Sequence, residues 1–139
     1  VGSLGIGVVL RGGAKPHRLY SIIAIFGFAA GVLCFWPGLG MTGHTAAMAA
    51  WFFLTGAGLA VIMATLPVVA EPERRGAAAA LINQAGAVAT FLNPPIWLGL
   101  AEGGEWTGFA LLLAIGWTLS VGAMWMMAAR LARQPGAKA

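Results

Sequence analysis

Apolar residues form five long blocks along the chain, separated by short polar turns. The blocks cover residues 1–10, 19–36, 45–70, 76–100 and 106–129. About 20 apolar residues in a helix cross the hydrocarbon core of a bilayer, so each of the last four blocks is long enough to span it. The block at residues 1–10 is too short, and we expect it to be the end of a helix that starts outside the sequence. The pattern predicts an all-α, polytopic membrane helical bundle with four full transmembrane helices and one partial helix.

The composition favours a membrane protein over a soluble domain. Of the 139 residues, 60% are hydrophobic and 9% are charged, whereas roughly 25% of the residues in an ordinary globular domain are charged. The basic residues behind the net charge of +4 lie in the short turns between the apolar blocks. Because a nucleic-acid-binding protein gathers its basic residues on one face, we expect a lipid bilayer and no nucleic acid as partner.

The basic residues alternate along the chain. They lie in the first turn, the third turn and the C-terminal tail: Arg11, Lys15, Arg18, Arg74, Arg75, Arg130, Arg133 and Lys138. The second turn, at residues 37–44, and the fourth, at residues 101–105, hold no Lys or Arg. Basic residues favour the cytoplasmic side of a membrane. The pattern therefore predicts a multi-pass protein with a cytoplasmic C-terminus, and we expect it in a bacterial inner (plasma) membrane.

The fourth block carries a polar stripe. At about 100° per residue, Thr90 and Asn93 lie on the same side of the helix as Asn83, within an arc of roughly 80°, whereas Gln84 lies off it. Amides and hydroxyls at membrane depth need a hydrogen-bonding partner or a water-filled cavity. One interpretation is a substrate pathway lined by this face. The other is that these groups bond to neighbouring helices and hold the bundle together.

Two adjacent prolines follow the stripe. Pro94 and Pro95 lack backbone N–H groups and crowd the preceding turn, so the sequence predicts a kink or a break near Asn93. A break at membrane depth frees carbonyl groups that can serve a ligand. A plain packing kink, or the last turn of the helix, is the alternative.

The third block has a similar face. Trp51, Thr55 and Thr65 share one side of the predicted helix with Gly58. We assign Trp51 and Thr55 to the candidate substrate pathway, where the indole would wall a cavity. The alternative is a buried Trp51 packed on Gly58.

Small residues predict close contacts between helices. Gly27 and Gly31 form a GxxxG pair, and Gly56 and Ala60 form a second pair of small residues at the same spacing. Such pairs let two helix backbones approach closely. In a chain with 21 glycines they also arise by chance.

Charged residues and His are absent from the interior of every apolar block. His17 and His44 fall in turns at opposite membrane faces, so they cannot share a metal ion. The single Cys34 cannot form a disulfide within one chain. Catalytic sets and phosphate-binding loops are also missing, so we expect no metal, no cofactor and no enzymatic activity, and a membrane enzyme is disfavoured.

Parts of the chain resemble the major facilitator superfamily of transporters. Residues 66–99 are similar to the passage between the tenth and eleventh helices of that family, at the matching positions Arg75, Gly76, Asn83, Gly86, Pro94 and Gly99. The first turn, GVVLRGGAKPHR, resembles a degraded copy of the family's cytoplasmic G-x-x-x-D-R-x-G-R-R loop. Arg11 stands at the position of its Asp and Gly12 at that of its Arg, while Lys15 remains as a base.

The resemblance implies that residues 1–139 are a fragment of a transporter's C-terminal helical bundle, half of a twelve-helix fold. Residues 1–10 would end helix eight, and the four full blocks would be helices nine to twelve; helices two to six are the alternative. The implied function is secondary active transport of a small solute by alternating access. The partners would be that small-molecule substrate and the remaining helices of the same transporter. The implied gating residues of the cytoplasmic loops are Lys15, Arg18, Arg74, Arg75 and Gly76.

A second function fits the same pattern. The chain could be a self-contained small membrane protein of four or five helices that acts as an oligomeric or accessory subunit. This alternative needs no helices beyond those in the sequence.

Overall fold

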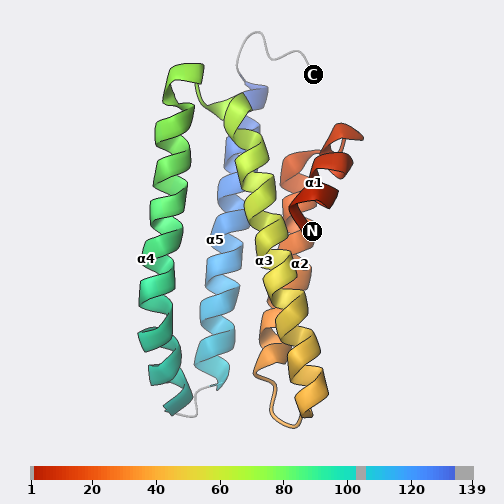
Figure 1. The fold of residues 1–139 in the computed structure, drawn as a ribbon, viewed down its shortest axis with the longest axis vertical. Coiled ribbons are helices and arrows are strands. Elements are labelled where there is room, and N and C mark those ends of the chain that lie inside the picture. The colour runs from red at the N-terminus through yellow and green to blue at the C-terminus, as the bar shows by residue number, and fades with distance from the viewer. Residues whose placement is uncertain (1, 103–105, 134–139) are drawn as a thin grey trace.

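The chain folds into helices joined by short turns. The computed structural model describes residues 2–102 and 106–133, and this part of the chain contains no β-strand. The helices, in chain order, are α1 (Gly2–Arg11), α2 (Pro16–Cys34), α3 (Met41–Val69), the 3-10 turn η1 (Pro72–Arg74), α4 (Arg75–Glu102) and α5 (Trp106–Ala132). Successive long helices run in opposite directions (Figure 1). The all-α prediction is therefore confirmed.

Three helices in the described part of the chain are long and apolar enough to cross a membrane. They correspond to Pro16–Cys34, Met41–Val69 and Thr107–Ala132. With 28 residues, α4 is also long enough, but Asn83, Gln84 and the two prolines make it less apolar than its neighbours. The fold fits an integral membrane protein, and three of the four predicted full spans are supported.

The turn between α1 and α2, η1 and the end of α5 lie at the same end of the bundle (Figure 1). These segments carry the basic residues of the described part of the chain: Arg11, Lys15, Arg18, Arg74, Arg75, Arg130 and Arg133. Lys138 lies outside the described residues. The basic residues, which occur in alternate turns of the sequence, thus lie together at one end of the bundle.

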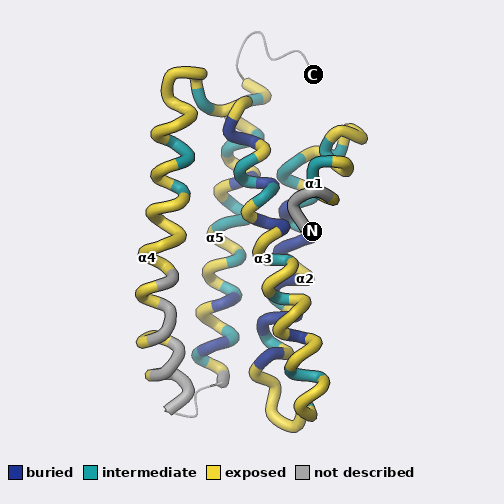
Figure 2. Tube along the Cα trace, viewed as in Figure 1, coloured by how far each residue is buried: buried dark blue, intermediate teal, exposed yellow. Residues whose placement is uncertain are grey.

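One face of α2 forms the centre of the packing. Its buried residues recur every three or four positions, the spacing of one side of a helix: Tyr20, Ile23, Ala24, Gly27, Ala30, Gly31 and Cys34. The main buried cluster joins this face to α3 and α5, through Tyr20, Ile23, Ala57, Val61 and Met124. Because α2 contacts both other apolar helices, α2, α3 and α5 share one core (Figure 2).

The GxxxG pair of α2 is a packing site. A Cβ atom on Gly27 would lie 2.8 Å from Cζ2 of Trp117, and one on Gly31 would lie 2.9 Å from Cδ1 of Leu113 and 3.3 Å from Nε1 of Trp51. Two indoles from different helices therefore occupy the space that these glycines leave. At Gly56, by contrast, an added Cβ would meet no atom within 4 Å, so Gly56 of the second pair makes no such contact.

Two helices begin earlier than the apolar blocks predict. α2 starts at Pro16 rather than at residue 19, because proline is well suited to the first turn of a helix. α3 starts at Met41 rather than at residue 45, after Gly40 in an extended conformation. The Thr45 hydroxyl donates to the Met41 carbonyl at 2.9 Å, so a polar first turn is tolerated within the helix.

α4 stands at the edge of the bundle (Figure 1). Most of its described residues are exposed, unlike the mixed pattern of α2 and α3 (Figure 2). Among the described residues, the main buried cluster and the hydrophobic residues packed against it come from α1, α2, α3 and α5. Judged by the residues whose burial is described, the helix with the polar stripe is thus largely uncovered by the rest of the chain.

Candidate functional site

The structure places the polar stripe on the exposed helix. Asn83 and Gln84 are both exposed on α4, as is Pro95. The backbone of Thr90, Asn93 and Pro94 lies in α4, but their side chains lie outside the described part of the chain. The predicted pathway residues of α4 are therefore on an edge helix, and the Asn83 side chain lies on the outer surface of the bundle.

The two prolines do not end the helix. α4 is helical from Arg75 to Glu102, on both sides of Pro94 and Pro95. A complete break near Asn93 is thus not found, because the backbone is helical again after the two prolines. A bend at this point stays a prediction.

On the face predicted for the third block, Trp51 and Gly58 both lie against α2. Trp51 packs on Gly31 of α2 and contacts Phe35 edge to face, with ring centroids 6.3 Å apart. Gly58 also faces α2, where a Cβ would lie 3.5 Å from Cε2 of Tyr20. The alternative contact of Trp51 with Gly58 is thus replaced by contacts of both residues with α2.

The hydroxyl groups of that face bond to their own helix. The Thr55 hydroxyl donates to the Trp51 carbonyl at 2.8 Å and is exposed. The Thr65 hydroxyl is buried and donates to the Ile62 carbonyl at 2.6 Å. Such bonds satisfy a hydroxyl at membrane depth without any partner helix.

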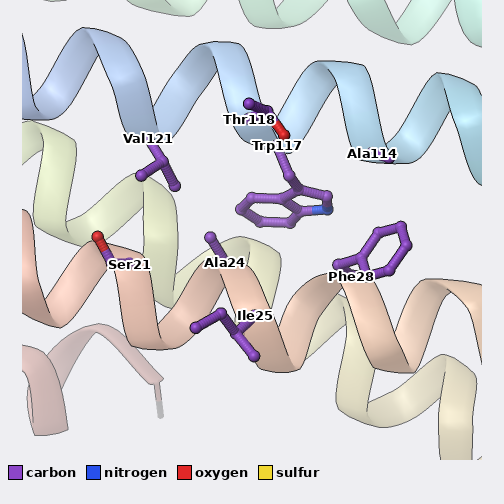
Figure 3. Close-up of a pocket in the computed structure, with 8 residues that line it drawn as sticks. All are labelled: Ser21, Ala24, Ile25, Phe28, Ala114, Trp117, Thr118 and Val121. Carbon is purple, nitrogen blue, oxygen red and sulfur yellow. The ribbon is translucent and has the colours of Figure 1, made fainter.

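A groove lies between α2 and α5. Its volume is about 360 Å³, and its lining is mostly apolar: Ser21, Ala24, Ile25, Phe28, Ala114, Trp117, Thr118 and Val121. The Trp117 indole lies across the space between the two helices, next to Ala24 (Figure 3). The groove offers one large aromatic surface with few polar groups, which suits an apolar ligand better than a charged one.

Polar contacts join α2 to α5 at the basic end of this groove. The Ser21 hydroxyl donates to the His17 carbonyl at 2.9 Å and accepts from Nε1 of Trp125 at 2.9 Å. The His17 ring meets the Trp125 ring edge to face, with centroids 4.5 Å apart. Nearby, the Tyr20 and Ser120 hydroxyls share a hydrogen bond.

The sequence did not indicate this α2–α5 contact, because its members lie about a hundred positions apart. One signal was present: Trp117, Ser120 and Met124 recur at helical spacing near the basic end of the last block. Aligning the first and last full blocks as neighbours would have brought that face to Tyr20 and Ser21.

The residues of the basic turns differ in their exposure and in the contacts that they make. Arg74 pairs with Glu71 at an Nε to Oε2 distance of 3.5 Å, and both side chains are highly exposed, at 81% and 71%. Gly76 is exposed, with no atom within 4 Å of a built Cβ. Lys15 precedes the first residue of α2, and Arg18 lies in its first turn.

Arg75 has a more specific position at the end of α3. Its guanidinium donates to the Pro67 carbonyl at 2.8 Å and to the Ala70 carbonyl at 3.2 Å. The last carbonyls of a helix lack intrahelical partners, and a cation there also meets the negative end of the helix dipole. Arg75, the first residue of α4, therefore ties the start of α4 to the end of α3.

Comparisons with protein-family models, with curated proteins and with solved structures found no match to this chain. The function is therefore inferred from the positions of its own residues.

Proposed function

We propose that this chain is part of a secondary active transporter of the major facilitator type, which moves a small solute across the membrane by alternating access. One observation carries the proposal. The helix with the amide face, α4, lies beside three membrane-length apolar helices but is covered by them over only a small part of its surface. Asn83 is exposed on that helix.

An amide facing hydrocarbon without a hydrogen-bonding partner is costly in free energy, by several kcal/mol in an environment without hydrogen bonds. The Asn83 side chain therefore needs a polar neighbour or water beside α4. Further helices of the same transporter, facing α4 across a water-filled pathway, would supply both. In this proposal Asn83, Thr90 and Asn93 line the pathway, and the chain is part of the C-terminal half of a twelve-helix fold.

The packing of the other helices supports a rigid half. α2, α3 and α5 are interlocked by two indoles on Gly27 and Gly31 and by hydroxyl contacts between α2 and α5. Alternating access requires helical bundles that rock as units about a central site. On α3, packing holds the Trp51 indole in one orientation, so it can act as a fixed wall beside the exposed Thr55.

The basic end supports an assignment of the cytoplasmic side. We place Lys15, Arg18, Arg74, Arg75 and Gly76 at cytoplasmic loops of a bacterial inner membrane, with a cytoplasmic C-terminus. Arg75 joins the ends of α3 and α4, so it would transmit movement between these helices during gating.

The test is transport by the complete protein in proteoliposomes, measured as saturable uptake of neutral small solutes under an imposed ion gradient. At equal membrane abundance, Asn83→Ala and Asn93→Ala should each lower the uptake rate more than Gln84→Ala, because Gln84 lies about 100° away around the helix. Equal losses at all three positions would contradict a pathway along this face.

The alternative is a self-contained four- or five-helix protein in which α4 faces a second copy. Chemical cross-linking in membranes distinguishes the two proposals. Cross-links from α4 to another copy of this chain would favour the oligomeric subunit, whereas cross-links from α4 to other helices of the same polypeptide would favour the transporter.

A further inference from the structure

A groove between α1 and α2 opens at the basic end of the bundle. It has a volume of about 440 Å³, and its wall combines apolar side chains with two basic ones. Val9 comes from α1, and Leu19 and Ile22 come from α2, while Lys15 and Arg18 stand where α2 begins. This groove is separate from the polar face of α4.

The two cations of the groove are not used inside the protein. Within the described part of the chain, neither the Lys15 ammonium nor the Arg18 guanidinium makes an ion pair or a side-chain hydrogen bond. The first 70 residues contain no Asp or Glu, so no carboxylate is close in sequence. Arg75, by contrast, is already bound to carbonyl groups at the end of α3. The groove therefore presents two uncompensated positive charges.

The apolar part of the groove is open in the same place. Val9 is 45% exposed and Ile22 is 53% exposed. α2 enters its membrane-length span at Pro16, so Lys15 and Arg18 lie at the level of lipid headgroups, and Ile22 lies about one and a half turns deeper. A ligand that fits must carry a negative charge at the headgroup level and an apolar chain below it.

We propose that this groove binds the headgroup of an anionic phospholipid. The phosphodiester accepts hydrogen bonds from the Lys15 ammonium and the Arg18 guanidinium, and an acyl chain covers Val9 and Ile22. Lys and Arg three positions apart at a helix start lie on one side, so both can reach one phosphate. The first turn of α2 holds no acidic residue, which leaves the positive end of its dipole to add to the attraction. The inference is independent of solute transport.

The test is native mass spectrometry of the complete protein, titrated in detergent with phosphatidylglycerol or phosphatidylcholine. The first phosphatidylglycerol should bind more tightly than the first phosphatidylcholine. A basic side chain near a membrane surface contributes about a fivefold change in the binding of anionic lipid, so Lys15→Gln with Arg18→Gln should weaken that first binding event by about 25-fold. Inorganic phosphate at millimolar concentration should not compete, because it lacks the acyl chain.

The matched control removes two other charges from the same end. Arg11→Gln with Arg133→Gln should leave the first dissociation constant within about twofold, because both residues are exposed and neither lines the groove. The exchange Lys15→Arg with Arg18→Lys keeps both charges and should keep the affinity. Equal losses in the two Gln double variants, a loss in the charge-retaining exchange, or no preference for phosphatidylglycerol would overturn the site. The last result would show that Lys15 and Arg18 do not select an anionic headgroup.

Discussion

Gly27 and Gly31 show how two missing side chains fix the position of three helices. Each glycine leaves room for an indole from a different neighbour, Trp117 of α5 at Gly27 and Trp51 of α3 at Gly31. Indoles bury large areas in a fixed orientation, so these two contacts set how far α3 and α5 lie from α2. The substrate-pathway assignment of Trp51 depends on this packing, because it determines which side of the indole stays open.

Gly27→Ala should destabilise the bundle. The new Cβ would lie 2.8 Å from Cζ2 of Trp117, and overpacking of this kind costs about 1–3 kcal/mol of unfolding free energy. Gly56→Ala is the matched control, since no atom lies within 4 Å of its Cβ; it should be neutral or stabilise by up to about 1 kcal/mol through helix propensity. Unfolding in mixed micelles on SDS titration measures both. The same loss in both variants would show that Trp117 does not occupy the space at Gly27.

At the residue level, one of the two pairs of small residues in the sequence lies at a helix contact, but the sequence did not show with which neighbour. The spacing of Gly27 and Gly31 indicates a contact face, and this is confirmed. Their partners Trp117 and Trp51 depend on how helices distant in sequence are arranged, and periodicity within one helix carries no information about that. The same limit applies to Trp51, whose contact with Gly31 of α2 was neither the cavity wall nor the Gly58 contact that the sequence suggested.

The junction of α3 and α4 is the most specific connection between two elements. α3 ends close to Pro67, η1 follows, and Arg75 at the start of α4 returns to the carbonyls of Pro67 and Ala70. The basic residues of this charged turn predicted a side of the membrane. The turn therefore also ends α3. Charge alone predicted the side of the membrane, whereas the hydrogen bonds depend on the local fold of the turn.

Arg75→Ala should loosen the end of α3. Loss of a cation at a helix C-terminus costs about 0.3–1 kcal/mol, so amide hydrogen exchange at Val69 and Ala70 should accelerate by up to about fivefold. Arg74→Ala is the control, because its partner is the exposed Glu71 and exposed ion pairs contribute little. If both variants accelerate exchange at the end of α3 equally, the specific role of Arg75 is wrong.

The lengths of the elements were only partly predictable. Apolar blocks located the helices, since water and hydrocarbon separate side chains strongly, but they missed the polar first turns of α2 and α3. Pro16 and Gly40 mark those starts more accurately than hydropathy does. The missing backbone N–H groups of Pro94 and Pro95 predicted a kink or a break in the helix. The helix continues through both prolines, so it is not broken there.

At the scale of the whole molecule, the chain is an interlocked unit with one helix at its edge. α1, α2, α3 and α5 supply the described core, and the basic residues gather at one end. The gathering of the basic residues follows from the sequence, because positive charge acts on whole segments. The position of α4 did not follow, since nothing in a helix's own pattern shows how much of it the rest of the chain covers.

That position gives the polar stripe its meaning. On a helix covered by its neighbours, the Asn83 side chain would hydrogen-bond to them and hold the bundle together, which is the alternative that the sequence left open. Asn83 on an exposed edge helix instead needs water or a further polypeptide segment beside it. We therefore propose that the Asn83 face of α4 borders a water-filled pathway.

Thiol labelling in intact membranes can test whether the Asn83 face of α4 is in contact with water. In the complete protein with Cys34→Ala, single cysteines replace Asn83, Leu81 or Ala85. Leu81 and Ala85 are both exposed, lie within about 3 Å of the depth of Asn83 on either side of it, and face roughly the opposite side of α4. The reagent is a charged methanethiosulfonate, which reacts only with thiols in contact with water.

We expect Asn83→Cys to react at least tenfold faster than Leu81→Cys and Ala85→Cys, and an added transported solute to slow only the reaction at position 83. Equal reactivity at the three positions, or reaction confined to Leu81→Cys and Ala85→Cys, would contradict a water-filled pathway along the Asn83 face.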